Sequence, residues 1–187
     1  MAHLSTMGEL GSFAPKFNLK NFNPRINKEN ISIDSLETYP ALLVTFFCNH
    51  CPYVIHIRDS FINFANEFNK KGLALVAINS NDIEEYPEDS PEKMAEDALK
   101  YSYPFPYLYD ESQEVAKKYS AVCTPDFFGY NKNSELQYRG RILEAKKLKP
   151  VHTGETELRK AMKLIAETGK GPQKQFPSMG CSIKWFK

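Results

Sequence analysis

The sequence predicts an α/β fold in which strands and helices alternate around one hydrophobic core. Residues 39–47, YPALLVTFF, form a continuous apolar run, which is typical of a strand buried on both faces. From Val54 to Phe68, apolar side chains recur every three or four residues, which predicts an amphipathic helix ending near Gly72. Residues 73–79, LALVAIN, again have the pattern of a buried strand. Strand, helix and strand with short connections indicate a βαβ unit with parallel strands and a right-handed crossover.

Further elements are expected on both sides of this unit. Before it, residues 17–22 and 30–36 have the alternation of a small N-terminal β-hairpin. After it, a helix is expected to be capped by Ser90 and to begin at Pro91, because proline is favoured at the first helical position. We expect this helix to end at about Tyr101.

The second half of the chain predicts antiparallel additions to the sheet. Asp110 and Gln113 have the spacing of a capping pair for a helix that runs to about Tyr119. Gly169 has the character of a helix C-cap. The other elements expected here are a short strand at 105–110, a β-hairpin formed by 126–131 and 136–143, and a helix at 155–168. Together the elements predict one layered α/β structure.

Length and composition favour a single globular domain. The 187 residues are 42% hydrophobic and 25% charged, which is ordinary for a chain that buries a sizeable core. We therefore expect one domain over residues 1–187, with an N-terminal hairpin extension at 1–38 and a C-terminal tail at 170–187. The tail contains Phe176, Ile183 and Trp185, so we expect it to pack on the domain or on a partner rather than to be fully solvated.

Charge and cysteine content exclude several classes of function. The net charge is +1 with scattered Lys and Arg, which predicts no nucleic-acid partner and no membrane-surface partner. The apolar runs are shorter than the roughly 20 residues of a membrane helix, and no secretory signal is visible. A cytoplasmic location is therefore expected. Four cysteines are too few and too unevenly spaced for a disulfide-stapled secreted domain, which favours reactive or ligand cysteines.

A pair of cysteines stands where the first buried strand meets the helix. The stretch FFCNHCPYV places Cys48 and Cys51 two residues apart, with His50 between them. Only roughly 3% of an unperturbed thiol is ionised at pH 7, so an attacking cysteine needs its thiolate stabilised. We expect the helix N-terminus and His50 to stabilise the thiolate of Cys48. Cys48 is therefore the expected nucleophile, and Cys51, inside the first helical turn, is expected to resolve a mixed disulfide.

A zinc site is the main alternative for these cysteines. Cys48, Cys51 and His56 have part of the spacing of a zinc knuckle, but the position of the fourth ligand holds Phe61. Cys123 or Cys181 would have to complete the site through the fold. A lone CxxC inside a βαβ unit is more often a redox motif, so we favour redox chemistry and expect no bound metal or cofactor. Two inert buried thiols are the least favoured interpretation.

Several longer motifs resemble one protein family. GSFAPKFNL, CNHCPYV, NSNDIEEYPEDSPEKM, FPYLYDESQEVAKKYSAVCTPDFF, YRGR and GCSIKW together resemble a peroxiredoxin-like branch of the alkyl hydroperoxide reductase and thiol-specific antioxidant superfamily. The resemblance covers nearly the whole chain. It implies a thioredoxin-like fold, with a central mixed β-sheet flanked by helices and an N-terminal β-hairpin. It also implies that Thr124 and Pro125 form a cis peptide facing the dithiol and support the site.

The chain departs from the family's better-known members at the site. Peroxiredoxins carry P-x-x-x-T/S-x-x-C. Counted back from Cys51, the proline and threonine positions hold Val44 and Cys48; counted back from Cys48, Thr45 fits and Ala41 does not. The expected arginine is also missing from KKYSAVCTPDFFGYN.

Thioredoxin has a buried aspartate and a tryptophan where this chain has Leu42 and Phe47, so the proton acceptor for Cys51 is unidentified. Asp82, Glu84 and Glu85 are candidates, although a solvated acidic loop is the favoured interpretation of these three residues.

The sequence therefore predicts a thiol-disulfide oxidoreductase with an antioxidant or redox role. Cys48 and Cys51 would cycle between dithiol and disulfide, acting on a protein or small-molecule disulfide and recharged by a dithiol donor such as a thioredoxin-type reductant. Peroxiredoxin-like reduction of a hydroperoxide at Cys48 or Cys51 is the first alternative. A zinc-binding module is the second.

Four further residues receive weaker assignments. Cys123 is expected to be a small buried hydrophobe rather than a third redox thiol. Cys181 is a candidate resolving thiol if the tail folds back over the site. Arg139 and Arg141 are expected at exposed positions of the second hairpin.

Overall fold

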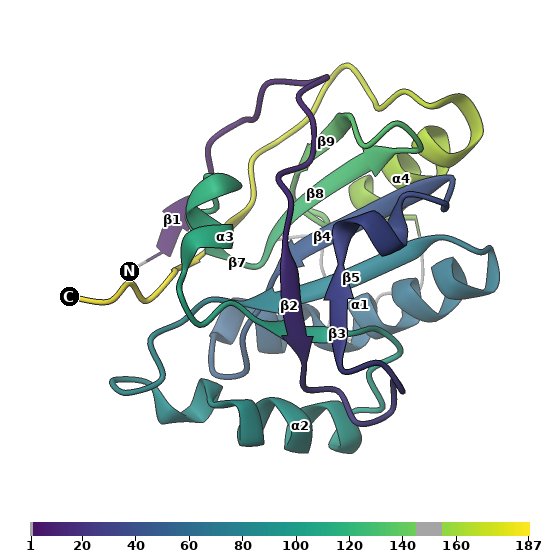
Figure 1. The fold of residues 1–187 in the computed structure, drawn as a ribbon. Helices are drawn as coiled ribbons and strands as arrows, with labels where there is room; N and C mark the ends of the chain where they lie inside the picture. The colour runs from purple at the N-terminus through teal and green to yellow at the C-terminus, as the bar shows by residue number, and fades with distance from the viewer. Residues whose placement is uncertain (1, 145–154) are drawn as a thin grey trace.

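A seven-stranded mixed β-sheet forms the centre of the computed structural model, which describes residues 2–144 and 155–187 (Figure 1). Its strand order is β3-β2-β6-β5-β4-β8-β9. The strands are β2 (Asn18–Asn21), β3 (Asn30–Ser32), β4 (Ala41–Phe46), β5 (Ala74–Asn79), β6 (Tyr107–Tyr109), β8 (Asp126–Asn131) and β9 (Leu136–Gly140). The α-helices of the described residues are α1 (Pro52–Lys70), α2 (Pro91–Lys100), α3 (Glu114–Lys118) and α4 (Glu157–Thr168). The α/β fold with a mixed central sheet is confirmed.

The predicted βαβ unit forms the middle of this sheet. β4 and β5 are parallel, with Val44 opposite Val76, and α1 connects them. All six residues of each strand are buried, as expected from their continuous apolar runs. The site therefore begins at the carboxyl end of a central strand, where the chain leaves β4 and enters α1.

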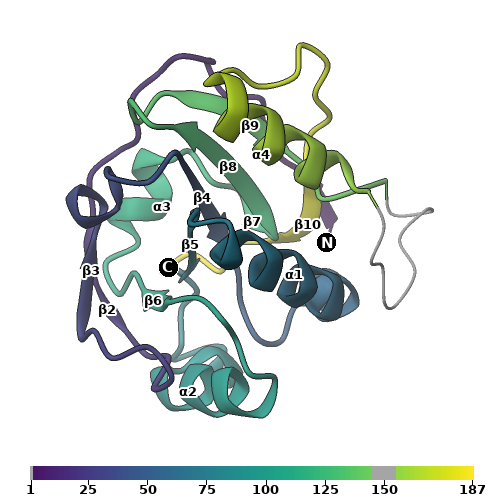
Figure 2. The ribbon, with the colours of Figure 1, turned by 90° about the vertical axis from the view of Figure 1, so that its right-hand side faces the viewer.

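Helices cover both faces of the sheet. Leu43 of β4 packs in the same hydrophobic cluster as residues of α1 and α4, whereas its neighbour Val44 packs in the cluster that contains residues of α3. This alternation follows from the two-residue period of a strand. Figure 2 shows α1 and α4 together on one side of the sheet and α3 on the other.

The N-terminal hairpin is confirmed and is part of the main sheet. β2 and β3 are antiparallel, with Leu19 opposite Ile31. β2 also pairs with β6, where Lys20 lies opposite Tyr109. The second predicted hairpin is also present, because β8 and β9 are antiparallel neighbours.

The C-terminal tail packs on the domain. Its strand β10 (Met179–Ser182) lies between β1 (Ala2–Leu4) and β7 (Cys123–Thr124) in a small three-stranded sheet of order β1-β10-β7. β1 and β10, which lie near opposite ends of the chain, therefore pair directly, with Ala2 opposite Cys181 (Figure 1). The sequence predicted that the tail packs, but it predicted neither β10 nor its pairing with β7.

The expected capping pair before α3 is wrong in its details. Gln113 is the N-cap residue, in a left-handed conformation with φ of 62°, and its side chain makes no cap hydrogen bond. Asp110 instead accepts hydrogen bonds from the backbone amides of Val115 and Ala116. The side-chain amide of Gln113 donates a hydrogen bond to the backbone carbonyl of Lys184. The Gln113 side chain therefore binds the C-terminal tail to the domain.

The two hairpin arginines are not exposed as expected. Arg139 is 3% exposed, and its guanidinium lies 3.5 Å from the carboxylate of Asp126. Arg141 donates two hydrogen bonds to Glu157 at the start of α4. Both arginines therefore have structural partners inside the chain.

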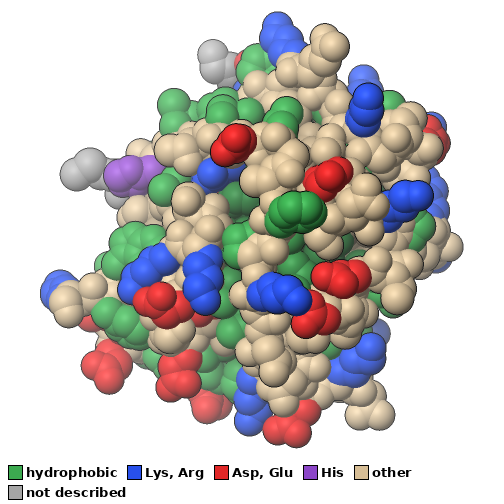
Figure 3. Space-filling model, turned by 45° about the horizontal axis from the view of Figure 1, so that its top comes forward, with side chains coloured by type: hydrophobic (Ala, Val, Ile, Leu, Met, Phe, Trp, Pro, Cys, Tyr) green, Lys and Arg blue, Asp and Glu red, His purple; other side chains and the backbone are tan. Residues whose placement is uncertain are grey.

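The surface view shows acidic and basic side chains interspersed over the face in Figure 3. Within residues 2–144 and 155–187, no helix is both long and apolar enough to cross a membrane.

Candidate active site

Cys48 and Cys51 lie in the connection between β4 and α1. Cys51 is the N-cap residue of α1, and Pro52 is its first residue, where the missing amide hydrogen costs no intrahelical hydrogen bond. The sequence predicts that Cys51 lies inside the first turn of the helix and that the helix amides stabilise Cys48. That placement is wrong, because the helix begins one residue after Cys51. The N-terminal amides of α1 therefore serve Cys51.

Both sulfurs contact Thr124, which precedes a cis peptide bond to Pro125. The Cys48 sulfur lies 3.2 Å from the hydroxyl oxygen of Thr124, and the Cys51 sulfur lies 3.2 Å from the carbonyl oxygen of the same residue. The predicted cis peptide and its position facing the dithiol are confirmed. Cys48 is 1% exposed and Cys51 is 0% exposed, so the pair is almost entirely covered.

The surroundings of the two sulfurs favour a thiolate on Cys51. A hydrogen bond from Cys48 lowers the pKa of Cys51 to about 4, with further donation from the backbone amide of Val54 and the hydroxyl of Thr124, against the opposing effect of burial. Burial raises the pKa of Cys48, and its hydrogen bond to Cys51 raises it further. Of the two thiols, Cys51 therefore has the lower pKa and Cys48 the higher one.

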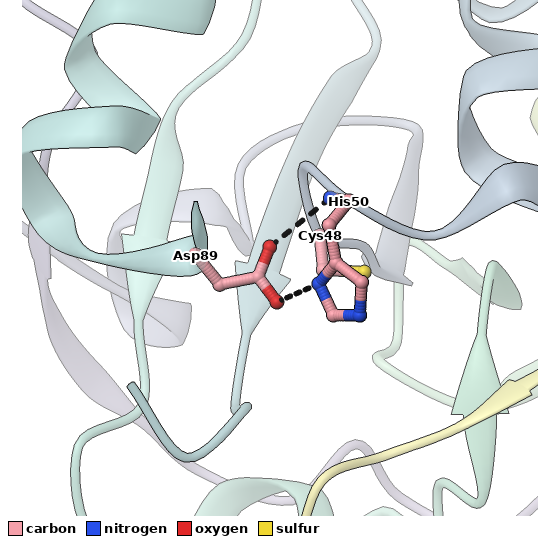
Figure 4. A group of neighbouring side chains, drawn as sticks. All are labelled: Cys48, His50 and Asp89. Atoms are coloured by element: carbon pink, nitrogen blue, oxygen red, sulfur yellow. Dashed lines mark hydrogen bonds and ion pairs between the residues drawn. The ribbon is translucent and has the colours of Figure 1, made fainter. Parts of the chain in front are cut away.

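His50 is paired with a buried aspartate that the sequence analysis did not identify. Its Nδ1 lies 2.6 Å from Oδ2 of Asp89, and the two side chains point toward one another in Figure 4. The hydrogen bond to Asp89 raises the pKa of His50. Burial disfavours the charge of Asp89, but hydrogen bonds from His50 and Asn81 outweigh it and lower the pKa of Asp89. A sulfur, a ring nitrogen and a carboxylate oxygen of Cys48, His50 and Asp89 all lie within 4.8 Å of one another.

The carboxylate that lies at the site is Asp89, and it is not one of the three acidic residues considered from the sequence. Asp82 accepts backbone hydrogen bonds from Glu84 and Glu85 in its own loop, which is a structural role. Asp89 follows the same strand, β5, and closes a short 3₁₀ helix at Pro87–Asp89. The carboxyl ends of the parallel strands β4 and β5 meet at one edge of the sheet, which brings the loop after β5 to the cysteines. This topological rule could have predicted that an acidic residue in the loop after β5, such as Asp89, lies near the cysteines.

The group formed by Cys48, His50 and Asp89 fits a metal ion poorly. Oδ1 of Asp89 accepts hydrogen bonds from the backbone amides of Asn49 and His50, and Oδ2 accepts from Asn81 and contacts His50. Both oxygens are therefore committed to protein donors, which leaves little capacity for an ion. Phe61, at the position of the missing knuckle ligand, is fully buried in the core.

The remaining two cysteines lie on adjacent strands beside this pair. Cys123 is buried on β7, its thiol donates to the Pro125 carbonyl at 3.8 Å, and burial raises its pKa. Cys181 is partly exposed on β10 and is a hydrogen-bonding neighbour of Cys51. Burial and the contact with Cys51 raise the pKa of Cys181 to about 11. The fold thus brings the candidate thiols together, although they are far apart in the sequence.

An apolar cleft opens beside Pro125. It has a volume of about 130 Å³ and is lined by residues that include Ile57 of α1, Phe127 of β8 and Met179 of β10.

Comparison with known proteins agrees with this architecture. A sequence model described as the AhpC/TSA family matches residues 10–143. The structure is similar to that of an uncharacterized conserved protein from Geobacillus kaustophilus, with 43% identity, a TM-score of 0.91 and coverage of 100% of this chain and 97% of that one. A hypothetical protein from Sinorhizobium meliloti is similar at 38% identity, with a TM-score of 0.88 and 98% of each chain covered. The search of curated proteins gave no match.

A more distant likeness identifies the fold. The thioredoxin domain of a thiol-disulfide oxidoreductase from Bacteroides vulgatus is 14% identical, with a TM-score of 0.57 and coverage of 71% of this chain and 89% of that one. The thioredoxin-like fold expected from the resemblance is thereby confirmed.

Proposed function

The chain belongs to the AhpC/TSA family, a family of thiol-redox proteins, and we propose that it is a thiol-disulfide oxidoreductase that cycles Cys48 and Cys51 between dithiol and disulfide. One observation carries the proposal: the sulfurs of Cys48 and Cys51 each lie 3.2 Å from an oxygen of the same residue, Thr124, which brings the two sulfurs together. A thiolate in contact with a thiol needs little movement to form a disulfide.

The first step is attack by the Cys51 thiolate on a substrate disulfide. One substrate sulfur becomes bonded to Cys51, and the other leaves as a thiolate, which takes a proton from the His50 imidazolium. This assignment reverses the sequence expectation that Cys48 attacks first. The reason is that the helix amide of Val54 and the thiol of Cys48 both stabilise the anion on Cys51.

The second step is attack by Cys48 on the sulfur of Cys51. The Cys48 thiol gives its proton to the neutral imidazole of His50, which lies beside it and is held by Asp89. The new Cys48–Cys51 disulfide releases the second substrate thiolate, which is protonated in turn. The substrate gains two electrons and two protons, and a dithiol donor of the thioredoxin type then returns the protein to its dithiol form.

The substrate is proposed to be a protein or small-molecule disulfide that carries an apolar group. The cleft beside Pro125 supports this proposal because it is mostly apolar and is lined by Pro125, the residue that follows Thr124. Apolar groups gain free energy when they leave water for such a cleft.

Hydroperoxide reduction is the second candidate, and the low pKa of Cys51 favours it. The Cys51 thiolate would attack the terminal peroxide oxygen and become a sulfenic acid, while the alkoxide leaves as an alcohol after protonation. Cys48 would then condense with the sulfenic acid, releasing water. A small hydroperoxide is also suited to a sulfur with so little exposed surface.

Two assays on the purified protein separate these candidates. One follows reduction of insulin disulfides with a dithiol donor, and the other follows consumption of hydrogen peroxide. Cys48→Ser and Cys51→Ser should each abolish catalytic disulfide turnover, whereas Cys123→Ser is the matched control and should retain it. Rapid peroxide consumption without disulfide turnover would favour the peroxidase. Stoichiometric zinc that protects the thiols from alkylation would exclude both redox functions.

A further inference from the structure

Cys181 lies directly against the reactive pair. In the pairing of β10 with β7, Cys181 is opposite Thr124, the residue whose oxygens contact both Cys48 and Cys51. The thiols of Cys181 and Cys51 are hydrogen-bonding neighbours. Cys48 and Cys181 are therefore both neighbours of Cys51.

The tail is held in this position by specific contacts. A Cβ atom on Gly180 would lie 2.0 Å from the carbonyl oxygen of Thr124, so only glycine allows β10 to approach this closely. Beyond Cys181, the amide of Ile183 donates to the carbonyl of Val122 at 3.1 Å. The amide of Lys184 donates to the side chain of Asn81 at 2.9 Å. These contacts of the terminal motif GCSIK hold the thiol of Cys181 in a fixed position beside the site.

Exposure distinguishes Cys181 from the other thiols of the described chain. Cys48, Cys51 and Cys123 are buried, whereas Cys181 is partly exposed. A protein-sized dithiol donor must place its own sulfur on a protein sulfur in line with the bond that breaks. Among the described thiols, Cys181 offers the least covered sulfur for this contact.

We propose that Cys181 is the thiol through which electrons enter the site, by forming a Cys51–Cys181 disulfide that an external dithiol donor reduces. The inference rests on the proposed function and names the route by which its disulfide is recharged. In the first exchange, the Cys181 sulfur attacks Cys51 within the Cys48–Cys51 disulfide. Cys48 leaves and takes the proton of Cys181, so one disulfide replaces another without net oxidation.

The donor completes the cycle in two exchanges. A donor thiolate attacks the partly exposed sulfur of Cys181, and Cys51 leaves as a thiolate. The second donor thiol then attacks the sulfur that the first has bonded to Cys181, which frees Cys181 as a thiol and leaves the donor oxidised. A thiol of low pKa leaves readily, and Cys51 is the most acidic thiol of the site.

Disulfide mapping tests the pairing. Wild-type protein and Cys48→Ser are oxidised with diamide, alkylated and digested, and the bridges are identified by mass spectrometry. We expect Cys48–Cys51 in the wild type and Cys51–Cys181 in Cys48→Ser, with Cys123 alkylated in both. If the wild type forms Cys48–Cys51 while Cys181 stays alkylatable in Cys48→Ser, the inference is overturned and the proposed function stands. If the wild type forms no Cys48–Cys51 bridge, the proposed function itself fails.

Recharging kinetics test the direction of electron flow. Oxidised protein is mixed with reduced thioredoxin, and the return of free thiols is followed in wild type, Cys181→Ser and Gly180→Ala. We expect recharging about tenfold slower in both variants, and the first reduction of insulin disulfide should be unchanged in Cys181→Ser. Ser182→Ala, on the same strand, is the control and should recharge at the wild-type rate. Equal rates in wild type and in a Cys181→Ser protein that retains its circular dichroism spectrum would overturn the inference.

Discussion

Nδ1 of His50 and Oδ2 of Asp89 lie 2.6 Å apart, and this pair places a titratable ring beside the thiol of Cys48. Asp89 is completely buried, and its other hydrogen bonds hold it in place, so the ring has a fixed anionic partner. A carboxylate in this position orients an imidazole and favours its protonated form. In the proposed function, His50 exchanges protons with the Cys48 thiol and with the leaving thiolates while Asp89 holds the ring.

Asp89→Asn should lower the pKa of His50, because the carboxylate that raises it is replaced by a neutral amide. The titration of His50, followed by NMR, should move to lower pH, and the limb of the pH–rate profile that reports His50 should move with it. Glu88→Gln, at the exposed neighbouring position, is the control and should leave both unchanged. His50→Ala should slow formation of the Cys48–Cys51 disulfide by about 100-fold. An unmoved His50 titration in Asp89→Asn would remove Asp89 from the account.

Two substitutions of Cys48 should have different effects on Cys51. Cys48→Ser keeps a hydrogen-bond donor beside the Cys51 sulfur, so the pKa of Cys51 should stay well below its ordinary value. Cys48→Ala removes the donor that lowers this pKa most, so the pKa should rise. Thiolate absorbance followed against pH measures both values. Cys123 and Cys181, whose pKa values are raised, remain protonated through the range of interest. Identical titrations in the two variants would show that Cys48 does not stabilise the thiolate.

Asp126→Asn should change how stability depends on pH. Burial raises the pKa of Asp126 to about 6, against hydrogen bonding by Ser5 and the charge of Arg139. Since the folded pKa exceeds the unfolded value, this group stabilises the fold below the unfolded pKa of about 3.9, and that stability is lost as pH rises through 6. The free energy of unfolding, from urea titrations, should therefore fall in the wild type relative to Asp126→Asn by about 2 kcal/mol between pH 4.5 and pH 7.5. A difference that is constant over this range would contradict the shift.

Local patterns predicted the centre of the fold. The βαβ unit could be predicted because its signals lie in consecutive residues. β4 and β5 are continuous apolar runs, and α1 has apolar residues at the helical period. The start of α2 was predicted for the same reason, because Ser90 caps it and Pro91 begins it. The predicted start of α1 was slightly too early. Proline is tolerated both at the first residue of a helix and later in its first turn, so Pro52 did not show whether Cys51 lies inside the helix or just before it.

The rest of the site depends on contacts between distant segments. Asp89 is 39 residues from His50, and its burial follows from how the loop after β5 packs, not from its immediate neighbours. Cys181 reaches Cys51 only because β10 pairs with β7, a pairing of two very short strands whose sequence has no alternation to reveal it. The burial of Arg139 likewise depends on Asp126, which lies on the neighbouring strand. Sequence patterns report local periodicity, whereas these contacts require the tertiary structure.

The order of attack by the two cysteines is the central claim, and trapping the mixed disulfide tests it most directly. Cys48→Ser/Cys181→Ser and Cys51→Ser/Cys181→Ser are each incubated with glutathione disulfide at pH 6, and the adducts are located by mass spectrometry. We expect a stable glutathione adduct on Cys51 in the first variant and none on Cys48 in the second, because Cys51 has the lower pKa. An adduct on Cys48 in the second variant, with none on Cys51 in the first, would contradict the account.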